Sequence, residues 1–287
     1  MIRPLADADM PALTRLVRSL LPTMVVTPEG LDHVRRWTDW WVAEEGGEIV
    51  GAARAGRGGR AWVGVDAGAR RSGIGGALLA QVEARLRRSG AATVEGWSDD
   101  AAGAGFAAAA GYRRARDKPV SVLRLDDAEL PPVEPPAGVR LHRLGELGSR
   151  LRELHALAVA CYADEPGGAG AEGEMPFERW LEEDMGVPHI SQEGSVVAEA
   201  DGRLAAYAVL LTDGEGHGEN DFTGTHPDYR NRGLARLVKL ASLHWAREHG
   251  LREIWTGNDG ENAPMLAVNR RLGYRVQHAR SKHVREL

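Results

Sequence analysis

The period of apolar and polar residues changes several times along the chain. Leucine and alanine recur at helical spacing in LRELHALAVACY, residues 151–162, whereas SVVAEA and RLAAYAVLL, residues 195–200 and 203–211, have strand-like runs. Asp201 and Gly202 between these runs favour a two-residue hairpin turn. Further strands and amphipathic helices alternate on both sides of this hairpin, which predicts an α/β fold with helices on both faces of a sheet.

The same order of elements occurs twice. Four pairs of landmarks are separated by 137, 155, 160 and 162 residues, respectively: Ile2 and Val139, Gly47 and Gly202, Gly73 and Gly233, Gly111 and Gly273. Offsets that grow only in steps are typical of two copies of one unit, with insertions in the second copy. We therefore expect an N-terminal domain at 1–128 and a C-terminal domain at 139–287.

Two segments interrupt the repeat. ELPPVEPPAG, residues 129–138, is rich in proline and is predicted to be a stiff linker. The segment 163–186 falls at the largest step in the offsets, and its glycine content favours a surface loop. Its acidic residues are Asp164, Glu165, Glu172, Glu174, Glu178, Glu182, Glu183 and Asp184.

Composition excludes several classes of protein. A net charge of −5 without a long basic run argues against nucleic acid as a ligand. No apolar run approaches the roughly 20 residues needed to cross a bilayer, and the N-terminus lacks the apolar core of a signal peptide, so we expect a cytoplasmic protein that does not bind membranes. Cys161, the single cysteine, is expected to be a small buried side chain. His217 and His226 lack further ligands at metal-binding spacing, so no metal is expected.

Each copy places arginines and a glycine directly before an amphipathic helix, in VDAGARRSGIGGALL, residues 65–79, and THPDYRNRGLARLVKL, residues 225–240. The apolar stripe that starts at Leu234 predicts a helix beginning near that residue. Unpaired first-turn amides, the helix dipole and flanking arginines together favour an anion site, and Gly233 leaves room for close approach. The alternative is an ordinary helix start with solvated arginines.

Other phosphate-binding motifs fit this turn poorly. A dinucleotide fingerprint requires a third glycine, but Leu78 stands there in the first copy, and Ala235 and Val238 interrupt the pattern in the second. The Gly-Lys-Ser/Thr ending of a P-loop is also missing. The remaining interpretation is a pyrophosphate held by backbone amides without a metal.

These motifs resemble those of a known family. Arg230-x-x-Gly233-x-Ala235 and Arg70-x-x-Gly73-x-Gly75 resemble the acyl-CoA pyrophosphate loop of the GNAT superfamily of N-acyltransferases, and TGNDGENAPMLAVNRRLGYR resembles its asparagine-containing strand-to-helix segment. The resemblance is clear over 139–287 and weaker over 1–125. It implies two tandem GNAT-like domains of the α/β (α+β) class, each a mixed, mostly antiparallel sheet flanked by helices, with acetyl-CoA as cosubstrate.

The resemblance also assigns residues around acetyl-CoA. In the second copy it implies contacts from the strand end, the turn and the following asparagines: Thr223, Gly224, Thr225, Arg230, Asn231, Arg232, Gly233, Leu234, Ala235, Arg236, Asn258, Asn262 and Asn269. In the first copy the corresponding residues are Val63, Val65, Arg70, Arg71, Ser72, Gly73, Ile74, Gly75 and Gly76.

The two copies differ in their candidates for proton removal. Acyl transfer to an amine requires a proton acceptor near the thioester. Glu219 and Asp221 are two residues apart on one strand, hence on one face, where histone-type GNAT enzymes keep their base. The first copy has Gly59 and Ala61 at these offsets, so we expect it to be non-catalytic. Solvated carboxylates on an edge strand are the alternative interpretation.

The sequence offers several candidates for the proton donor to the departing thiolate. Many GNAT enzymes have a tyrosine four residues before the terminal glycine of the last helix, where this chain has Asn269 and, in the first copy, Ala107. An amide can donate a hydrogen bond but cannot act as an acid. Either the thiolate leaves unassisted as a fairly stable anion, or Tyr229, Tyr274 or a water donates the proton. Tyr274 is expected to belong to the core.

The sequence therefore predicts an acetyl-CoA-dependent N-acetyltransferase that acts on a primary amine of a small molecule or peptide. The acidic insertion, if it covers the acceptor site, favours a cationic amine; a solvated acidic surface loop is the alternative. The tandem architecture also resembles mycothiol synthase, so acetylation of a cysteinyl-aminosugar is one alternative. A non-catalytic acyl-CoA-binding or sensing protein is the other. We expect a monomer or homodimer.

Overall fold

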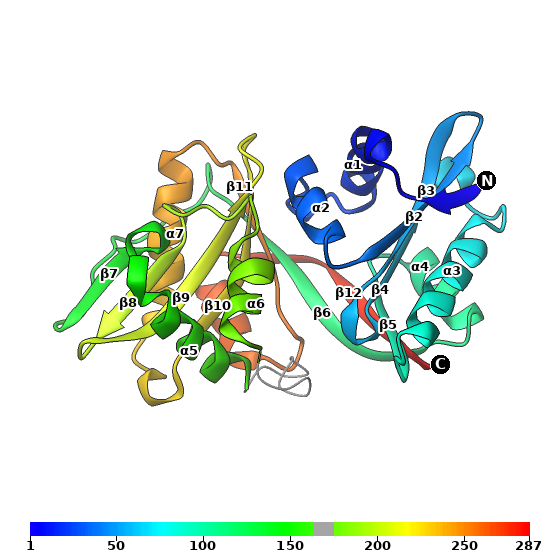
Figure 1. The fold of residues 1–287 in the computed structure, drawn as a ribbon. Helices are drawn as coiled ribbons and strands as arrows, with labels where there is room; N and C mark the ends of the chain where they lie inside the picture. Colours follow the sequence, from blue (N-terminus) through cyan, green and yellow to red (C-terminus); the bar gives the residue numbers. More distant parts are fainter. Residues whose placement is uncertain (164–174) are drawn as a thin grey trace. The chain divides into compact units, whose positions relative to one another are not determined.

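In the computed structural model, which describes residues 1–163 and 175–287, the chain forms two units and returns to the first at its end (Figure 1). The first unit comprises Met1–Lys118 and His278–Leu287, and the second comprises Pro119–Gln277. Each unit contains β-strands flanked by helices, which confirms the predicted α/β fold class.

The first unit is built around the antiparallel order β1-β2-β3-β4. Its strands are β1 (Ile2–Pro4), β2 (Asp39–Glu45), β3 (Glu48–Ala55), β4 (Ala61–Val65) and β5 (Thr93–Ser98); its helices are α1 (Met10–Leu20), α2 (Pro28–Arg35), α3 (Ile74–Arg88) and α4 (Ala101–Ala109). Leu78, Leu79 and Val82 of α3 form a core cluster on one face of the sheet. Leu13 and Leu16 of α1 belong to a separate cluster that includes Val42 and Ala52.

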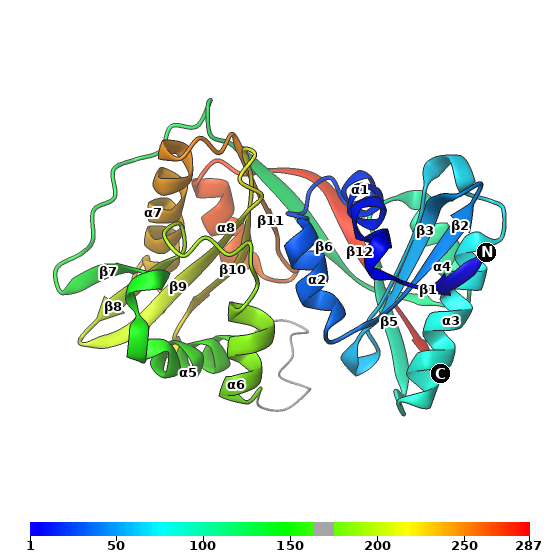
Figure 2. The same ribbon diagram turned by 45° about the horizontal axis from the view of Figure 1, so that its top comes forward.

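The second unit contains the strand order β6-β11-β10-β9-β8-β7, with only β10 and β11 pairing in parallel. Its strands are β7 (Val139–Arg143), β8 (Val196–Ala200), β9 (Arg203–Thr212), β10 (His217–Thr225) and β11 (Glu253–Gly257); its helices are α5 (Leu151–Tyr162), α6 (Phe177–Trp180), α7 (Leu234–Glu248) and α8 (Ala263–Arg271). Helices α5 and α7 cover opposite faces of this sheet (Figure 2). The predicted helix start at Leu234 is confirmed, and Asp201 and Gly202 have the positive φ angles of the expected hairpin turn.

The two units exchange their last strands. A Gly-Tyr-Arg motif occurs at residues 111–113 and again at 273–275. β6 (Arg113–Arg124) extends from the first copy of this motif, yet its residues Val120–Arg124 pair with β11 of the second unit. β12 (Arg275–Glu286) follows the second copy, yet its residues Ser281–Glu286 pair with β5 of the first unit. The C-terminal strand therefore provides the antiparallel partner of β5, a strand of the N-terminal copy.

The proline-rich stretch 129–138 lies within the second unit. Leu130 and Val133 pack against the core of that unit, and the His244 Nε2–H donates to the carbonyl oxygen of Pro131 at 2.8 Å. This segment therefore packs against the core of the second unit and is hydrogen-bonded to α7. Among the described residues, no helix is long and apolar enough to cross a membrane.

Candidate functional site

The turns before α3 and α7 have the same backbone conformation. The residues that precede these helices, Gly73 and Gly233, have φ angles of 86° and 79°, and Arg71 and Asn231, two positions earlier, have φ angles of 66° and 62°. Neither helix has a side chain that caps its N-terminus. Closely spaced left-handed residues aim successive N–H groups into a concavity that binds anions, so both turns fit a pyrophosphate.

An arginine in each turn is fixed in the same way. The Nε–H of Arg230 donates to the carbonyl oxygen of Thr225 at 3.3 Å, and the Nε–H of Arg70 donates to that of Val65 at 3.3 Å. Each guanidinium is thereby tied to the end of the strand before the turn. The identical contacts in both copies favour a preformed anion site over an ordinary helix start.

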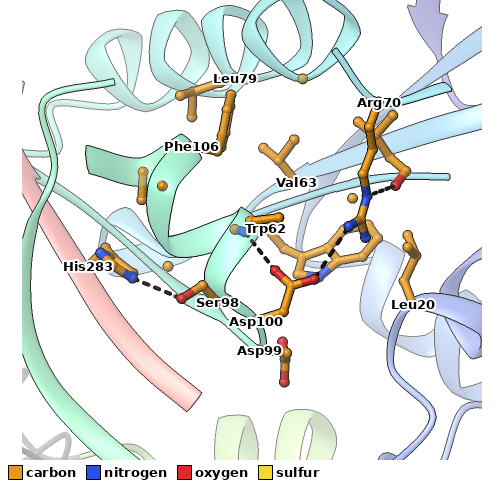
Figure 3. A pocket seen from close by; sticks show the side chains of 18 of the residues that line it. Leu20, Trp62, Val63, Arg70, Leu79, Ser98, Asp99, Asp100, Phe106 and His283 are labelled. Carbon is orange, nitrogen blue, oxygen red and sulfur yellow. Dashed lines mark hydrogen bonds and ion pairs between the residues drawn. The ribbon is translucent and has the colours of Figure 1, made fainter. Parts of the chain in front are cut away.

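The first unit contains a cavity of about 550 Å³ beside its turn (Figure 3). Most of the residues predicted around acetyl-CoA in this copy line the cavity: Val63, Val65, Arg70, Arg71, Gly73, Gly75 and Gly76. The exceptions are Ser72 and Ile74. Sequence reasoning missed the rest of the wall, which includes Trp62, Leu79, Ser98, Phe106 and His283. Nothing in the local sequence marks these residues, because they come from separate elements.

The cavity exists because β4 and β5 separate. The two strands meet at one isolated parallel bridge, between Arg60 and Glu95. A Cβ added to Gly96 would lie 3.0 Å from the carbonyl oxygen of Ala61, so the backbones are in close contact there. Beyond this point, Ala61–Val65 and 96–98 line the cavity from its two sides.

A buried serine–histidine pair lies in the same cavity. Ser98 Oγ and His283 Nε2 are 2.9 Å apart, and both side chains are buried. Burial lowers the pKa of His283, and the nearby Arg114 lowers it further. In Figure 3 this pair and Arg70 lie on opposite sides of the cavity. His283 reaches the first unit only through the exchanged strand β12.

In the second unit, the strand with the predicted carboxylates carries a β-bulge. Glu219 lies opposite Leu211 and Phe222 lies opposite Val209, so Asp221 is an additional residue in β10. Glu219 therefore shares a face with Phe222, and the bulge interrupts the simple alternation from which Glu219 and Asp221 were predicted to share a face. Glu219 is half-buried and Asp221 is exposed.

Glu219 also marks the end of the parallel ladder. The β10–β11 pairing comprises His217, Gly218 and Glu219 opposite Glu253–Trp255, whereas β10 continues to Thr225. Thr223, Gly224 and Thr225 thus follow the last paired residue on this side of the strand. Backbone groups beyond a ladder can bond to a bound amide chain such as pantetheine.

Several predicted polar groups cluster near these strand ends. Asn269 Nδ2 donates to Asn258 Oδ1, which brings two of the predicted asparagines together. Within the described chain, the Thr225 Oγ1 and the Asn269 Oδ1 are buried without a hydrogen-bond partner. Buried orphan groups of this kind are costly unless a ligand or water pairs with them. The Asn262 Oδ1, by contrast, caps α8 by accepting from Met265 N at 3.2 Å.

The remaining turn residues serve partly structural roles. Leu234 belongs to the α7 core cluster. Arg232 lies 4.8 Å from the centroid of the Tyr229 ring and 3.6 Å from an oxygen of Asp201. Arg232, Gly233 and Arg236 border a second cavity of about 400 Å³ with the prolines of 131–136.

The two tyrosines considered as proton donors are buried. Tyr229 belongs to the core cluster that also contains Leu234 and Leu237. Tyr274 donates its hydroxyl hydrogen to Asn220 Oδ1 at 2.6 Å, and burial raises its pKa. A proton that is held more tightly is a poorer acid at neutral pH. Both rings are therefore better explained as packing groups.

The acidic insertion is only partly described. Asp164, Glu165, Glu172 and Glu174 lie outside the described residues. Glu178 pairs with Arg152 at 3.3 Å and Glu183 pairs with Arg179 at 3.2 Å, so part of the acidic charge is locally balanced. Cys161 is buried, as expected. In the described part of the chain, no group of three or more histidine, cysteine or acidic residues could hold a metal.

Comparison with known proteins agrees with this geometry. Residues 151–274 match the acetyltransferase (GNAT) family, and residues 36–114 match an acetyltransferase (GNAT) domain. Mycothiol acetyltransferase from Thermomonospora curvata is 32% identical over 176 residues, which cover 61% of this chain and 57% of the relative. The enzyme of that name from Thermobifida fusca is 29% identical, over 57% of this chain and 51% of the relative. The matches thus span little more than half the length of these relatives.

Solved structures are similar over the whole chain. A tandem GNAT protein from the clavulanic acid biosynthesis pathway has a TM-score of 0.77 at 25% identity and covers 100% of this chain and 98% of its own. A GCN5-related N-acetyltransferase from Sphaerobacter thermophilus has a TM-score of 0.76 at 21% identity, over 100% of this chain and 95% of its own. With two matched domains, two equivalent turns and this fold, the chain belongs to the GNAT acetyltransferase family and carries two GNAT domains in tandem.

Proposed function

We propose that the protein is an acetyl-CoA-dependent N-acetyltransferase whose chemistry takes place in the second unit. The observation that carries this proposal is the position of Glu219 at the end of the β10–β11 ladder, on the strand that leads into the anion-binding turn before α7. Acetyl-CoA supplies an activated thioester. The turn residues Arg230–Arg236 would hold its pyrophosphate, and Thr223–Thr225 would align the pantetheine.

Glu219 is proposed to accept the proton of the attacking amine. The nitrogen forms a bond to the acetyl carbon, the carbon–sulfur bond breaks, and the electron pair leaves with the thiolate of CoA. A carboxylate accepts the proton directly or through one water. Asp221, on the bulge beside Glu219, would contribute negative charge that attracts a cationic amine. Asn269, close to Asn258, would donate a hydrogen bond to the pantetheine or the thiolate.

The decisive experiment compares two carboxylates. Glu219→Gln should lower kcat by about a hundredfold, the usual contribution of a general base, while leaving the affinity for acetyl-CoA unchanged. Glu215→Gln is the matched control, because Glu215 is an exposed glutamate in the loop before β10. Changes at Arg70 or Gly73 should affect turnover much less. Comparable losses from Glu219→Gln and Arg70→Ala would contradict the assignment of chemistry to the second unit.

The acceptor is proposed to be a small molecule or peptide with a primary amine. The mycothiol acetyltransferases among the relatives favour a cysteinyl-aminosugar as one member of the test panel. CoA release above the rate without amine, measured with acetyl-CoA and a panel of aminosugars, polyamines and peptides, would identify the class. Turnover on none of them, with stable acetyl-CoA binding, would favour the acyl-CoA-sensing alternative.

The first unit is proposed to bind acyl-CoA as well. Its cavity adjoins a turn with the same φ angles and the same arginine contact as the turn of the second unit. It has Gly59 and Ala61 where the second unit has its carboxylates, so the amine chemistry proposed above has no base there. Calorimetry should therefore find two binding sites for acetyl-CoA per chain, one of which is lost in Gly73→Val because of its positive φ.

A further inference from the structure

The first unit lacks the carboxylates of the second unit but has a different pair of reactive groups. Ser98 Oγ and His283 Nε2 are within hydrogen-bonding distance, at 2.9 Å, and both residues line the cavity of about 550 Å³. The residue that corresponds to Ser98 in the second copy, at the 160-residue offset, is Asn258, which bonds to Asn269 instead. The serine–histidine pair is therefore a feature of the first unit.

The geometry suits a nucleophile and its base. A hydroxyl becomes nucleophilic when an imidazole nitrogen within about 3 Å accepts its proton. Burial keeps the pKa of His283 below its ordinary value, so the ring is neutral near pH 7 and free to accept. Within the described chain, the Nδ1 of His283 has no hydrogen-bond partner. The protein therefore does not lock the ring in one tautomer.

The wall next to Ser98 offers donors for a developing negative charge. Asp100 caps α4 by accepting from Gly103 N at 2.6 Å. Ala101 and Ala102, in the first turn of α4, also line the cavity. First-turn amides have no partners inside a helix and favour negative charge. Such amides can stabilise the oxyanion that forms when a hydroxyl attacks a thioester.

We propose that the first unit is a second active site, in which Ser98 takes the acyl group from an acyl-CoA and His283 acts as the base. This inference rests on the proposed binding of acyl-CoA in the first cavity. The Ser98 Oγ forms a bond to the thioester carbon while its proton moves to the Nε2 of His283. The carbon–sulfur bond breaks, and the thiolate takes that proton to give free CoA and an acyl ester on Ser98.

Water completes the cycle. A water molecule attacks the ester carbon and gives one proton to His283, the carbon–Oγ bond breaks, and Ser98 recovers its proton. The products are a carboxylic acid and CoA, so the net reaction is hydrolysis of the thioester. No amine and no group from the second unit take part in these steps.

The test measures CoA release without an amine, together with the intact mass of the denatured full-length protein after incubation with acetyl-CoA. We expect amine-independent release that falls by about a hundredfold in Ser98→Ala and in His283→Asn. Ser98→Cys should instead accumulate a stable mass increase of one acetyl group at residue 98. Ser89→Ala is the control, because this serine lies at the end of α3 and its hydroxyl donates to the carbonyl oxygen of Leu86.

Further variants separate this proposal from the function proposed above. Glu219→Gln should keep the Ser98-dependent release while losing amine acetylation. If calorimetry shows acetyl-CoA in the first unit but neither release nor acylation depends on Ser98, the second active site is refuted and the amine chemistry stands. The second active site would also be refuted if the acetyl group were found on another residue, or if acetyl-CoA did not bind in the first unit. Unchanged binding in Ser98→Ala excludes unfolding as the cause of lost release.

Discussion

Gly233 and Gly250 lie at the two ends of α7 and have the same φ angle of 79°. An added Cβ would meet no atom within 4 Å at either position. The backbone conformation, rather than lack of space, therefore accounts for glycine at both places. The two residues differ in surroundings, because Gly233 precedes the unpaired first-turn amides and Gly250 follows the last turn.

This pair provides a matched test at the level of single residues. Gly233→Ala and Gly250→Ala should each destabilise the protein by about 1 kcal/mol, since both force alanine into the left-handed region. Only Gly233→Ala should also weaken acetyl-CoA binding at the second unit, because it shifts the amides that face the pyrophosphate. Calorimetric titration and thermal unfolding check the two effects, and equal affinities in the two variants would argue against the anion site.

Among the elements, α7 carries a charged residue, Lys239, among its buried side chains. Lys239 is only 1% exposed, and its Nζ lies 5.0 Å from the centroid of the Tyr274 ring. Burial lowers the pKa of Lys239 to about 7. The unfolded chain keeps the ordinary pKa of lysine, so between pH 7 and about 10 the unfolded state binds more protons than the folded state.

The stability of the folded state should therefore rise with pH across this range. We expect the free energy of unfolding to increase by at most about 3 kcal/mol between pH 7 and pH 9. Lys239→Met removes the titrating group, keeps most of the side-chain volume and should make the unfolding free energy nearly independent of pH in this window. Urea titrations at both pH values provide the measurement. A pH dependence that persists in Lys239→Met would assign it to another group.

At the scale of the whole molecule, the exchanged strands join the two copies of the repeat. β5 pairs with β12 over Thr93–Ser98 and meets the chain beside β4 at a single bridge. Without residues 275–287, β5 would lose its antiparallel partner, and the cavity would lose His283. An unpaired strand exposes backbone groups that must be hydrated or paired elsewhere.

A fragment that ends at residue 128 should therefore be incompletely folded. We expect rapid hydrogen exchange at residues 93–98 in this fragment and no detectable affinity for acetyl-CoA. Addition of a peptide that corresponds to residues 275–287 should restore protection of β5, whereas a peptide with the same composition in scrambled order should not. Full protection of the fragment without the peptide would show that the exchanged strand is dispensable.

Much of the fold was predictable because it is encoded locally. The spacing of apolar residues predicted the start of α7, and Asp201-Gly202 predicted the hairpin turn between β8 and β9. Both signals depend on residues only a few positions apart in the sequence. The arginine-glycine turns likewise predicted two anion sites, and both turns have the same left-handed backbone angles. The bulge at Asp221 was missed because a single extra residue in a strand leaves no clear mark in the alternation of polar and apolar positions.

The sequence by itself determined that this protein has two similar copies of one unit and that a helix begins near Leu234, and it predicted where backbone amides could bind a pyrophosphate. These properties depend on contacts between residues close in the chain. Only the tertiary structure decided which strand completes which sheet, because β6 and β12 follow the same motif and each could pair with either copy. That choice brings His283 to Ser98, 185 residues away along the chain, and joins two groups that no local pattern connects.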